Sequence, residues 1–390
     1  MRPFSLVLAL SLILPLSAGA DDAPSGFFGR SDTESDTASD TAAFRALLHQ
    51  IPALMVTPGV SGAEIGFGDL AAARGLPEPA PGGRLPAETV SAARAMPPGT
   101  LVEALGFPAA EWRSRVGFAP ADIEQVILYG APPLLGGVYR LAPGVAAGVP
   151  AALEAQGYVP ATENGVAALA VGADGRMDLA ARAPADPFRG PLGRSSRVQV
   201  EGDLLRHGST WPMLGALQGA GAASARDEPL MAAMVGMLDG LDRGVLLRAY
   251  LLPDALALST GDPAAALTGQ GAGGSVLLWH SLLLADFSTG AEATAALVLS
   301  LGWPESEPLD GLVEAVERLW QEGVTGAGAS FATMLGGGVE VEARRGPGGM
   351  ALLRLVVTGP VEENAAGLAV NRGFDAIYRA VMMREMVFLP

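Results

Sequence analysis

Cysteine and lysine are both absent from this 390-residue sequence. Without cysteine the chain has neither structural disulfides nor a cysteine for lipid attachment. The lack of lysine excludes a P-loop, because that motif needs a lysine beside the nucleotide phosphates. There are only three histidines, His49, His207 and His280, and no two have the i, i+4 spacing of a helical zinc-binding pair. The side chains most often found in metal centres and nucleophilic sites are therefore scarce.

Positive charge is also scarce. The chain has 41 acidic residues and 25 basic ones, which gives a formal net charge of −16 at pH 7. Because an acidic surface repels phosphate groups, we expect no nucleic-acid partner and no electrostatic docking on anionic lipid. A charged fraction of 17% beside an apolar fraction of 49% indicates a globular chain with a buried core.

The first twenty residues have the pattern of a cleavable secretory signal peptide. Arg2 is followed by an uncharged, leucine-rich run from Phe4 to Leu16, and small residues precede Asp21 at positions 18 and 20. The apolar run is shorter than the roughly 20 residues of a membrane-spanning helix, which disfavours the alternative of an uncleaved anchor. We therefore expect cleavage after Ala20, a periplasmic or secreted protein, and no transmembrane span after cleavage.

Composition and periodicity divide the chain into five regions. Repeated Ser-Asp-Thr triplets predict disorder after the signal peptide, and Phe44, Leu47, Leu48 and Ile51 then recur at helical spacing. The predicted regions are a signal peptide (1–20), a disordered acidic linker (21–42), a helical N-terminal region (43–125), a first α+β repeat (126–260) and a second α+β repeat (261–390).

The two repeats are inferred from a shared order of elements. The first is predicted as a strand at Gly137–Ala142, a helix at Val145–Gln156 and a hairpin around Ala173–Arg176. The second is predicted as a strand at Val276–Phe287, helices at Ala291–Leu301 and Leu309–Gln321, and a hairpin around Gly346–Gly349. Asp-Gly and Pro-Gly-Gly sequences favour the two hairpin turns.

Two similar helix ends support this repeat. Gly157-Tyr158 and Gly302-Trp303 each combine a glycine with a large apolar residue, which is typical of a left-handed helix C-cap. Single strands are predicted at Arg197–Arg206 and Val245–Ser259, and a final helix at about Glu362–Met386. The predicted fold class is α+β, with two β-α-β-β-type pseudo-repeats that form antiparallel sheets, helices packed on one face and a short helical region before them.

Two stretches of the sequence contain the residue types of known functional motifs but lack the structural setting that those motifs require. The glycine-rich run Gly269–Gly274 precedes a predicted strand, whereas a dinucleotide fingerprint must follow a strand and open a helix. His207 has Asp203 and Ser209 nearby in the sequence, but the members of a catalytic triad converge from separate segments. We interpret the first as a loop and expect no hydrolytic site at the second.

Methionine is the one residue type whose pattern in the sequence stands out. Met231, Met234 and Met237 follow each other at intervals of three on a predicted helix. Thioether sulfur is a soft ligand that suits Cu(I), but methionine also fills apolar cores and adaptable partner surfaces. Core packing is the favoured interpretation, and the alternatives are a partner surface and a copper site.

The sequence contains no motif that identifies a reaction or a cofactor, and no catalytic residue stands out. We expect an exported, non-catalytic binding or accessory protein without a cofactor. Its partner would be another exported protein or a small ligand, held on an apolar patch or in a groove between the two repeats. The alternatives are a periplasmic copper-handling protein and a hydrolase that uses carboxylates.

Overall fold

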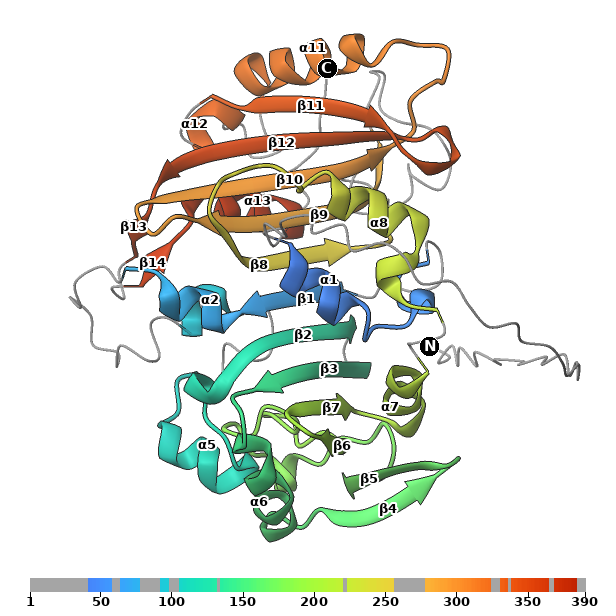
Figure 1. Cartoon of the computed structure of the whole chain (residues 1–390), viewed down its shortest axis with the longest axis vertical. Coiled ribbons are helices and arrows are strands. Elements are labelled where there is room, and N and C mark those ends of the chain that lie inside the picture. Colours follow the sequence, from blue (N-terminus) through green and yellow to red (C-terminus); the bar gives the residue numbers. More distant parts are fainter. Residues whose placement is uncertain are drawn as a thin grey trace, which may run out of the picture. The chain divides into compact units, whose positions relative to one another are not determined.

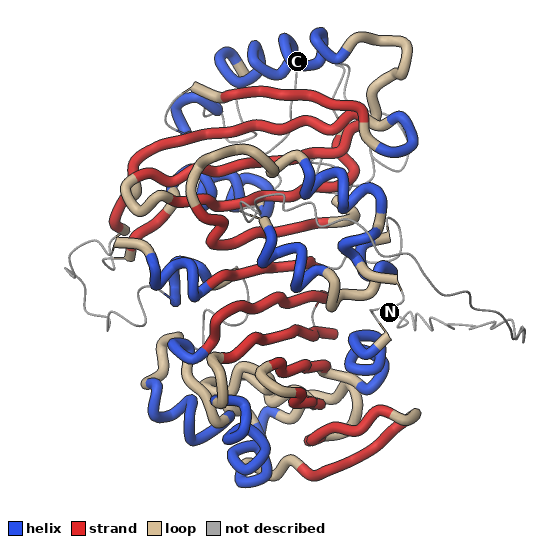
Figure 2. Tube along the Cα trace, viewed as in Figure 1, coloured by secondary structure: helices blue, strands red, loops and turns tan. Residues whose placement is uncertain are grey.

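One antiparallel sheet organises the protein (Figures 1 and 2). The computed structural model describes residues 41–57, 64–77, 92–97, 105–131, 134–219, 223–255, 278–323, 330–335, 338–364 and 368–383. The order of the twelve strands across the sheet is β11 (Glu340–Arg345), β12 (Ala351–Pro360), β10 (Glu292–Leu301), β9 (Trp279–Ser288), β8 (Val245–Leu252), β1 (Glu64–Asp69), β2 (Ile123–Ala131), β3 (Leu134–Leu141), β7 (Leu204–Gly208), β6 (Ser196–Glu201), β5 (Val166–Val171) and β4 (Val159–Glu163). Two short strands, β13 (Glu362–Glu363) and β14 (Ala369–Val370), pair separately. The predicted α+β class with antiparallel pairing is confirmed.

The helices connect and cover these strands. They are α1 (Ala42–Leu48), α2 (Leu70–Gly75), α5 (Ala109–Val116), α6 (Val149–Ala155), α7 (Trp211–Gln218), α8 (Pro229–Gly236), α11 (Leu309–Glu322), α12 (Phe331–Leu335) and α13 (Arg372–Met382). Short 3₁₀ turns lie at Ala53–Val56, Pro120–Asp122, Val145–Gly148, Leu179–Ala181, Ala225–Asp227 and Pro347–Gly349. Within the described ranges, no helix is both long and apolar enough to cross a membrane.

The sheet consists of two halves with related topology. In each half a three-stranded meander is followed by a helix and a hairpin: β1–β2–β3, α6 and β4–β5 in the first half, and β8–β9–β10, α11 and β11–β12 in the second. The first half also contains the hairpin β6–β7, which lies between β3 and β5. The halves join where β1 pairs with β8, with Phe67 opposite Ala249. The repeated unit is thus larger than the predicted β-α-β-β order.

Helices lie on both faces of the sheet, whereas the sequence analysis expected one. Along β10, Leu297 and Leu299 belong to one core cluster, while Ala296 and Val298 belong to another on the opposite face. We call the face covered by α1, α7 and α8 the α8 face (Figure 1). The opposite face is the α13 face, covered by α11, α12 and α13 in the second half and by α2, α5 and α6 in the first.

The helix predicted at Ala291–Leu301 is wrong, because this segment is strand β10. Its alanines and leucines favour a helix, yet β10 pairs with β9 on one side and β12 on the other and is buried on both faces. Tertiary pairing overrides the local helix propensity. Gly302 consequently ends no helix and lacks a positive φ, whereas Gly157 follows α6 with φ of +86° as predicted.

Two predicted strand arrangements are also corrected. The hairpin turn of the first half is Asn164-Gly165, where both residues have positive φ, and not Asp174-Gly175. The segment predicted as one strand at Arg197–Arg206 folds back at Gly202 to give β6 and β7. Both true turns carry an Asn-Gly or a Gly-Asp pair, which favours a two-residue hairpin loop.

Other differences lie near the ends of the described ranges. Strand β1 lies within the region predicted to be helical, and the final helix begins at Arg372 because β13 and β14 occupy residues before it. Helix α11 agrees with its predicted segment, and α8 agrees with the helix predicted to carry Met231 and Met234. The predicted signal peptide, most of the predicted linker and the run Gly269–Gly274 lie outside the described residues.

Candidate ligand-binding site

A cavity of about 100 Å³ lies on the α13 face at the junction of the two halves. Its walls come from β1, β2, β3, β7, β8 and the connection between β5 and β6: Glu64, Gly66, Leu128, Tyr129, Gly130, Leu135, Gly136, Tyr139, Pro187, Phe188, Arg194, His207 and Tyr250. This cavity is smaller than a cavity of roughly 150 Å³ in another protein that accepts benzene, so a ligand held here would be small and would fill the cavity closely.

Strand register explains why the cavity forms here. A single row of residues crosses five strands, running from His207 through Gly137, Leu128 and Gly66 to Tyr250. All five therefore lie on the same face of the sheet. Gly66 contributes no side chain between Leu128 and Tyr250, which leaves an unfilled space in this row.

His207 is the most unusual residue of the cavity. It is 5% exposed, and its ring lies beside that of Phe188, with 5.0 Å between the ring centroids. Its Nε2 atom has no hydrogen-bond partner among the residues that the structure describes. A buried polar atom left in this state costs about 1–3 kcal/mol, and a ligand that supplies a partner would recover that cost.

The imidazole of His207 is neutral at pH 7. Burial lowers its pKa to about 3, with further contributions from the positive charges of Arg194 and Arg197. Depending on the tautomer, a neutral imidazole nitrogen either donates or accepts a hydrogen bond. The site can therefore meet a hydroxyl, carbonyl or carboxyl group of a ligand.

Arg194 brings a positive charge to the His207 end of the cavity, which it lines at 8% exposure. Arg197 lies on the α8 face of the sheet, over the ring of Trp211. There its Nε is 3.0 Å from Asp174 and its guanidinium donates to the carbonyls of Val171 and Gly172.

The opposite end of the cavity is negative. Glu64 of β1 lines it beside Tyr250 of β8. Burial raises the pKa of Tyr250, and the charge of the Glu64 carboxylate raises it further. The ring of Tyr378 in α13 meets that of Tyr250 edge-on at 5.0 Å, so this end of the cavity contacts the second half.

A turn around Asp186 fixes Phe188 over the cavity. Asp186 Oδ1 accepts hydrogen bonds from the backbone amides of Phe188 and Arg189, at 2.8 and 3.1 Å. Although both bonds favour the carboxylate, burial raises the pKa of Asp186 to about 6. The turn therefore holds the Phe188 ring in place as one wall of the cavity, and it does so by burying the ionisable Asp186 side chain.

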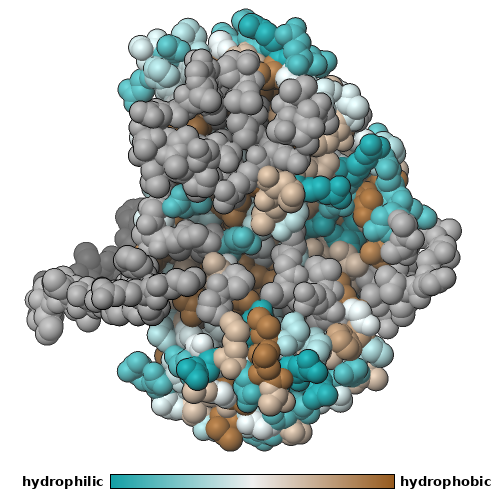
Figure 3. Space-filling model, turned by 180° about the vertical axis from the view of Figure 1, so that it is seen from behind, coloured by the Kyte–Doolittle hydropathy of each residue, from teal (hydrophilic) through white to brown (hydrophobic). Residues whose placement is uncertain are grey.

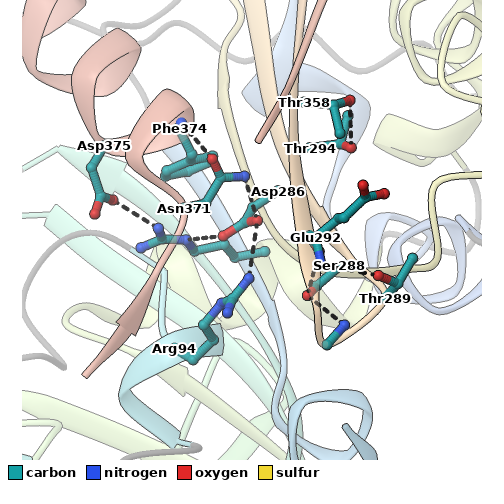
Figure 4. A network of polar contacts seen from close by, with 12 residues as sticks. Arg94, Asp286, Ser288, Thr289, Glu292, Thr294, Thr358, Asn371, Phe374 and Asp375 are labelled. Atoms are coloured by element: carbon teal, nitrogen blue, oxygen red, sulfur yellow. Dashed lines mark hydrogen bonds and ion pairs between the residues drawn. The ribbon is translucent and has the colours of Figure 1, made fainter. Parts of the chain in front are cut away.

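A second buried polar cluster lies on the same face, around Asp286 of β9 (Figure 4). Its carboxylate accepts a hydrogen bond from Asn371 at 2.7 Å, pairs with Arg248 at 3.0 Å and lies 3.8 Å from Arg94. Arg248 also bonds to Asp375 at 2.7 Å. These contacts attach α13 and residues 92–97 to the sheet, and we interpret the cluster as structural.

A larger but shallower groove of about 480 Å³ lies beside β4, β5 and β6. Its lining is dominated by alanine, valine, proline and leucine side chains. Each lining contains a buried polar atom without a partner among the described residues, His207 Nε2 in the cavity and Gln199 Oε1 in the groove. We regard the smaller cavity as the better candidate site because it is more enclosed.

The three methionines highlighted by the sequence lie in the core of the α8 face. Met231, Met234 and Met237 are 1%, 0% and 2% exposed. The prediction that their side chains face the interior is confirmed. A copper ion would need local opening of this core to reach their sulfur atoms.

The structure does not bring His207, Asp203 and Ser209 together as a triad. Asp203 Oδ1 accepts from the backbone amide of Gly144, while Ser209 Oγ accepts from that of Leu135. Of the other histidines, His49 Nδ1 lies 3.2 Å from Ser224 Oγ and His280 is half-buried. Within the described ranges, no three His, Asp or Glu side chains are grouped to hold a metal ion.

Sequence reasoning missed most of the cavity. Glu64, Arg194 and Tyr250 are far apart in the sequence, and only the register of the sheet brings their strands or loop to one place. The one signal available was the scarcity of histidine together with the apolar residues that surround His207.

Comparisons with known proteins do not assign a family. No family model matches the sequence, and no curated protein does. Among solved structures, crystal forms III, I and IV of TP0453 are similar, with 8%, 9% and 8% identity and TM-scores of 0.39, 0.37 and 0.39. The matches cover 85%, 85% and 87% of this chain and 97%, 97% and 99% of those chains. At TM-scores below 0.5 these likenesses support no conclusion about function.

Proposed function

We propose that this protein is an exported binding protein that holds a small ligand in the cavity at the junction of its two halves, without turning it over. The observation that carries the proposal is His207, a buried neutral imidazole in the cavity lining whose Nε2 has no partner among the described residues. Export is supported by the signal-peptide pattern of the first twenty residues.

The chemistry of the cavity favours binding over catalysis. A general base works best when its pKa is close to the working pH, and the pKa of His207 is about 3. Burial raises the pKa values of Tyr129, Tyr139 and Tyr250, so these phenols stay protonated at neutral pH. The described lining contains no serine or threonine that could serve as a nucleophile.

A small ligand also suits the surface better than a protein partner. Among the described residues, the large exposed apolar side chains are spread over many elements, including Leu54, Leu134, Val159, Leu179 and Met383. In the view from behind, the coloured hydrophobic atoms form separate patches between hydrophilic ones (Figure 3). A protein-docking surface is more often contiguous.

Selective labelling of histidine tests the proposal. With [¹⁵N]histidine the spectrum has signals from three imidazoles only. Titration with phenol, a ring with one hydrogen-bonding group, is expected to shift the His207 signals and leave those of His49 and His280 unchanged. The His207→Leu variant assigns the signals and should bind phenol more weakly. Uniform small shifts of all three histidines, or none at saturating phenol, would refute the proposal.

A further inference from the structure

The two ends of the cavity carry opposite charge. Arg194 lies at the His207 end and Glu64 lies at the Tyr250 end. Between them the lining is aromatic or apolar, with Phe188, Tyr139 and Leu128. A ligand that matches this layout needs an anionic group, a short apolar body and a cationic group, in that order.

The strand spacing sets the length of that ligand. Glu64 on β1 and His207 on β7 are separated by three strand-to-strand steps and by two residues along the strand, because Gly66 is the β1 residue in line with His207. This amounts to about 16 Å between their backbones. Both side chains extend into this interval, which leaves space for charged groups only a few bonds apart. The volume of about 100 Å³ sets the same limit.

We infer that the ligand is a small zwitterion, an inference that rests on the function proposed above. Its carboxylate lies beside Arg194 and bonds to His207 Nε2, and its ammonium group lies beside Glu64. A guanidinium and a carboxylate form charge-assisted hydrogen bonds that are about twice as strong as neutral ones. Because each charge of the ligand meets an opposite charge, neither is buried uncompensated.

Half-buried Glu64 also indicates the route of binding. His207 is almost fully buried, whereas the Glu64 side chain reaches solvent in part. The carboxylate therefore enters first and the ammonium group remains nearest to solvent. Lengthening the ligand at the ammonium end should be tolerated better than branching at the carboxylate end.

Three probes of equal chain length test this inference in the full chain: 4-aminobutanoate, butanoate and butylamine. We expect 4-aminobutanoate to bind with a Kd at least tenfold lower than either singly charged probe, measured from the His207 [¹⁵N]imidazole shifts. The Glu64→Gln variant keeps the shape of the side chain and should abolish this advantage over butanoate.

The outcomes separate this inference from the proposed function. If butanoate binds as tightly as 4-aminobutanoate, or if Glu64→Gln has no effect, the zwitterion is refuted although the cavity still binds ligands. Equal binding of butylamine would refute the carboxylate end. If none of the three shifts His207, the zwitterion is likewise refuted, and the separate phenol titration decides whether the cavity binds small molecules at all.

Discussion

Two buried polar clusters on the same face of the sheet contrast in one respect. Around Asp286, the carboxylate meets Asn371, Arg248 and Arg94. In the cavity, His207 Nε2 has no hydrogen-bond partner among the described residues. Nε and Nη2 of Arg94 also lack hydrogen bonds to described residues, but Arg94 forms an ion pair with Asp286, whereas His207 lines a cavity in which a ligand can supply the missing partner. The comparison therefore favours a structural role for the first cluster and binding for the second.

The largest expected effect is at the structural cluster. Asp286→Ala leaves Arg94 and Arg248 buried without their shared carboxylate, which should lower the free energy of unfolding by about 3–5 kcal/mol. Urea unfolding measures this loss. The control is Asp375→Ala, whose side chain is 42% exposed and which should cost less than about 1 kcal/mol. Equal losses for both variants would remove the distinction between a buried carboxylate and an exposed one.

The buried, neutral state of His207 should make the stability of the protein depend on pH. The pKa of His207 is about 3 in the folded protein and about 6.5 when unfolded. The unfolded chain alone takes up the proton between these values, so stability is lost as the pH falls below 6.5. From pH 7 to pH 4 the wild type should lose about 3 kcal/mol more than His207→Leu. Parallel stability curves for the two proteins would contradict the buried neutral imidazole.

Asp186 should make stability change with pH in the opposite direction. Its pKa is about 6 when folded and about 3.9 when unfolded, so the folded state alone holds the proton between these values. Stability contributed by this group is therefore lost as the pH rises from 4 to 6, by about 2–3 kcal/mol. Asp186→Asn keeps the acceptor for the amides of Phe188 and Arg189 and should gain that amount relative to wild type at pH 7. A loss of stability in this variant would mean that the charge itself supports the turn.

The smallest effect on stability is expected at Gly66, which contributes no side chain to the cavity lining. Gly66→Ala places a methyl group on the face that lines the cavity and should stabilise strand β1 by roughly 0.5 kcal/mol, because glycine weakens strands. The same methyl group should weaken phenol binding at least tenfold and leave the Asp286 cluster unchanged. Undiminished phenol binding would show that the row from His207 to Tyr250 does not form the floor of the site.

The sequence predicted those parts of the fold that depend on local signals. Helix α6 with its cap at Gly157, helix α11, and the β11–β12 hairpin around Pro347 were all expected from periodicity and turn residues. Strand β10 was not, because its alanines and leucines favour a helix and only its pairing with β9 and β12 makes it a strand. Local propensity carries no information about such distant partners.

The candidate site was harder to predict from the sequence than the local elements of the fold, for the same reason. His207 could be singled out as one of few histidines, but its partners depend on register. Gly66 lies in line with His207 only because β1, β2, β3 and β7 pair in that order. A glycine in a strand pattern indicates a close approach or an open space, and the sequence alone does not tell which.

A crystal structure of the full chain grown with 4-aminobutanoate tests the central claim most directly. The account predicts density for the ligand in the cavity, with its carboxylate within about 3.2 Å of His207 Nε2 and its ammonium group beside Glu64. Density for the ligand elsewhere, or a cavity closed by protein side chains with Nε2 bonded to one of them, would contradict it.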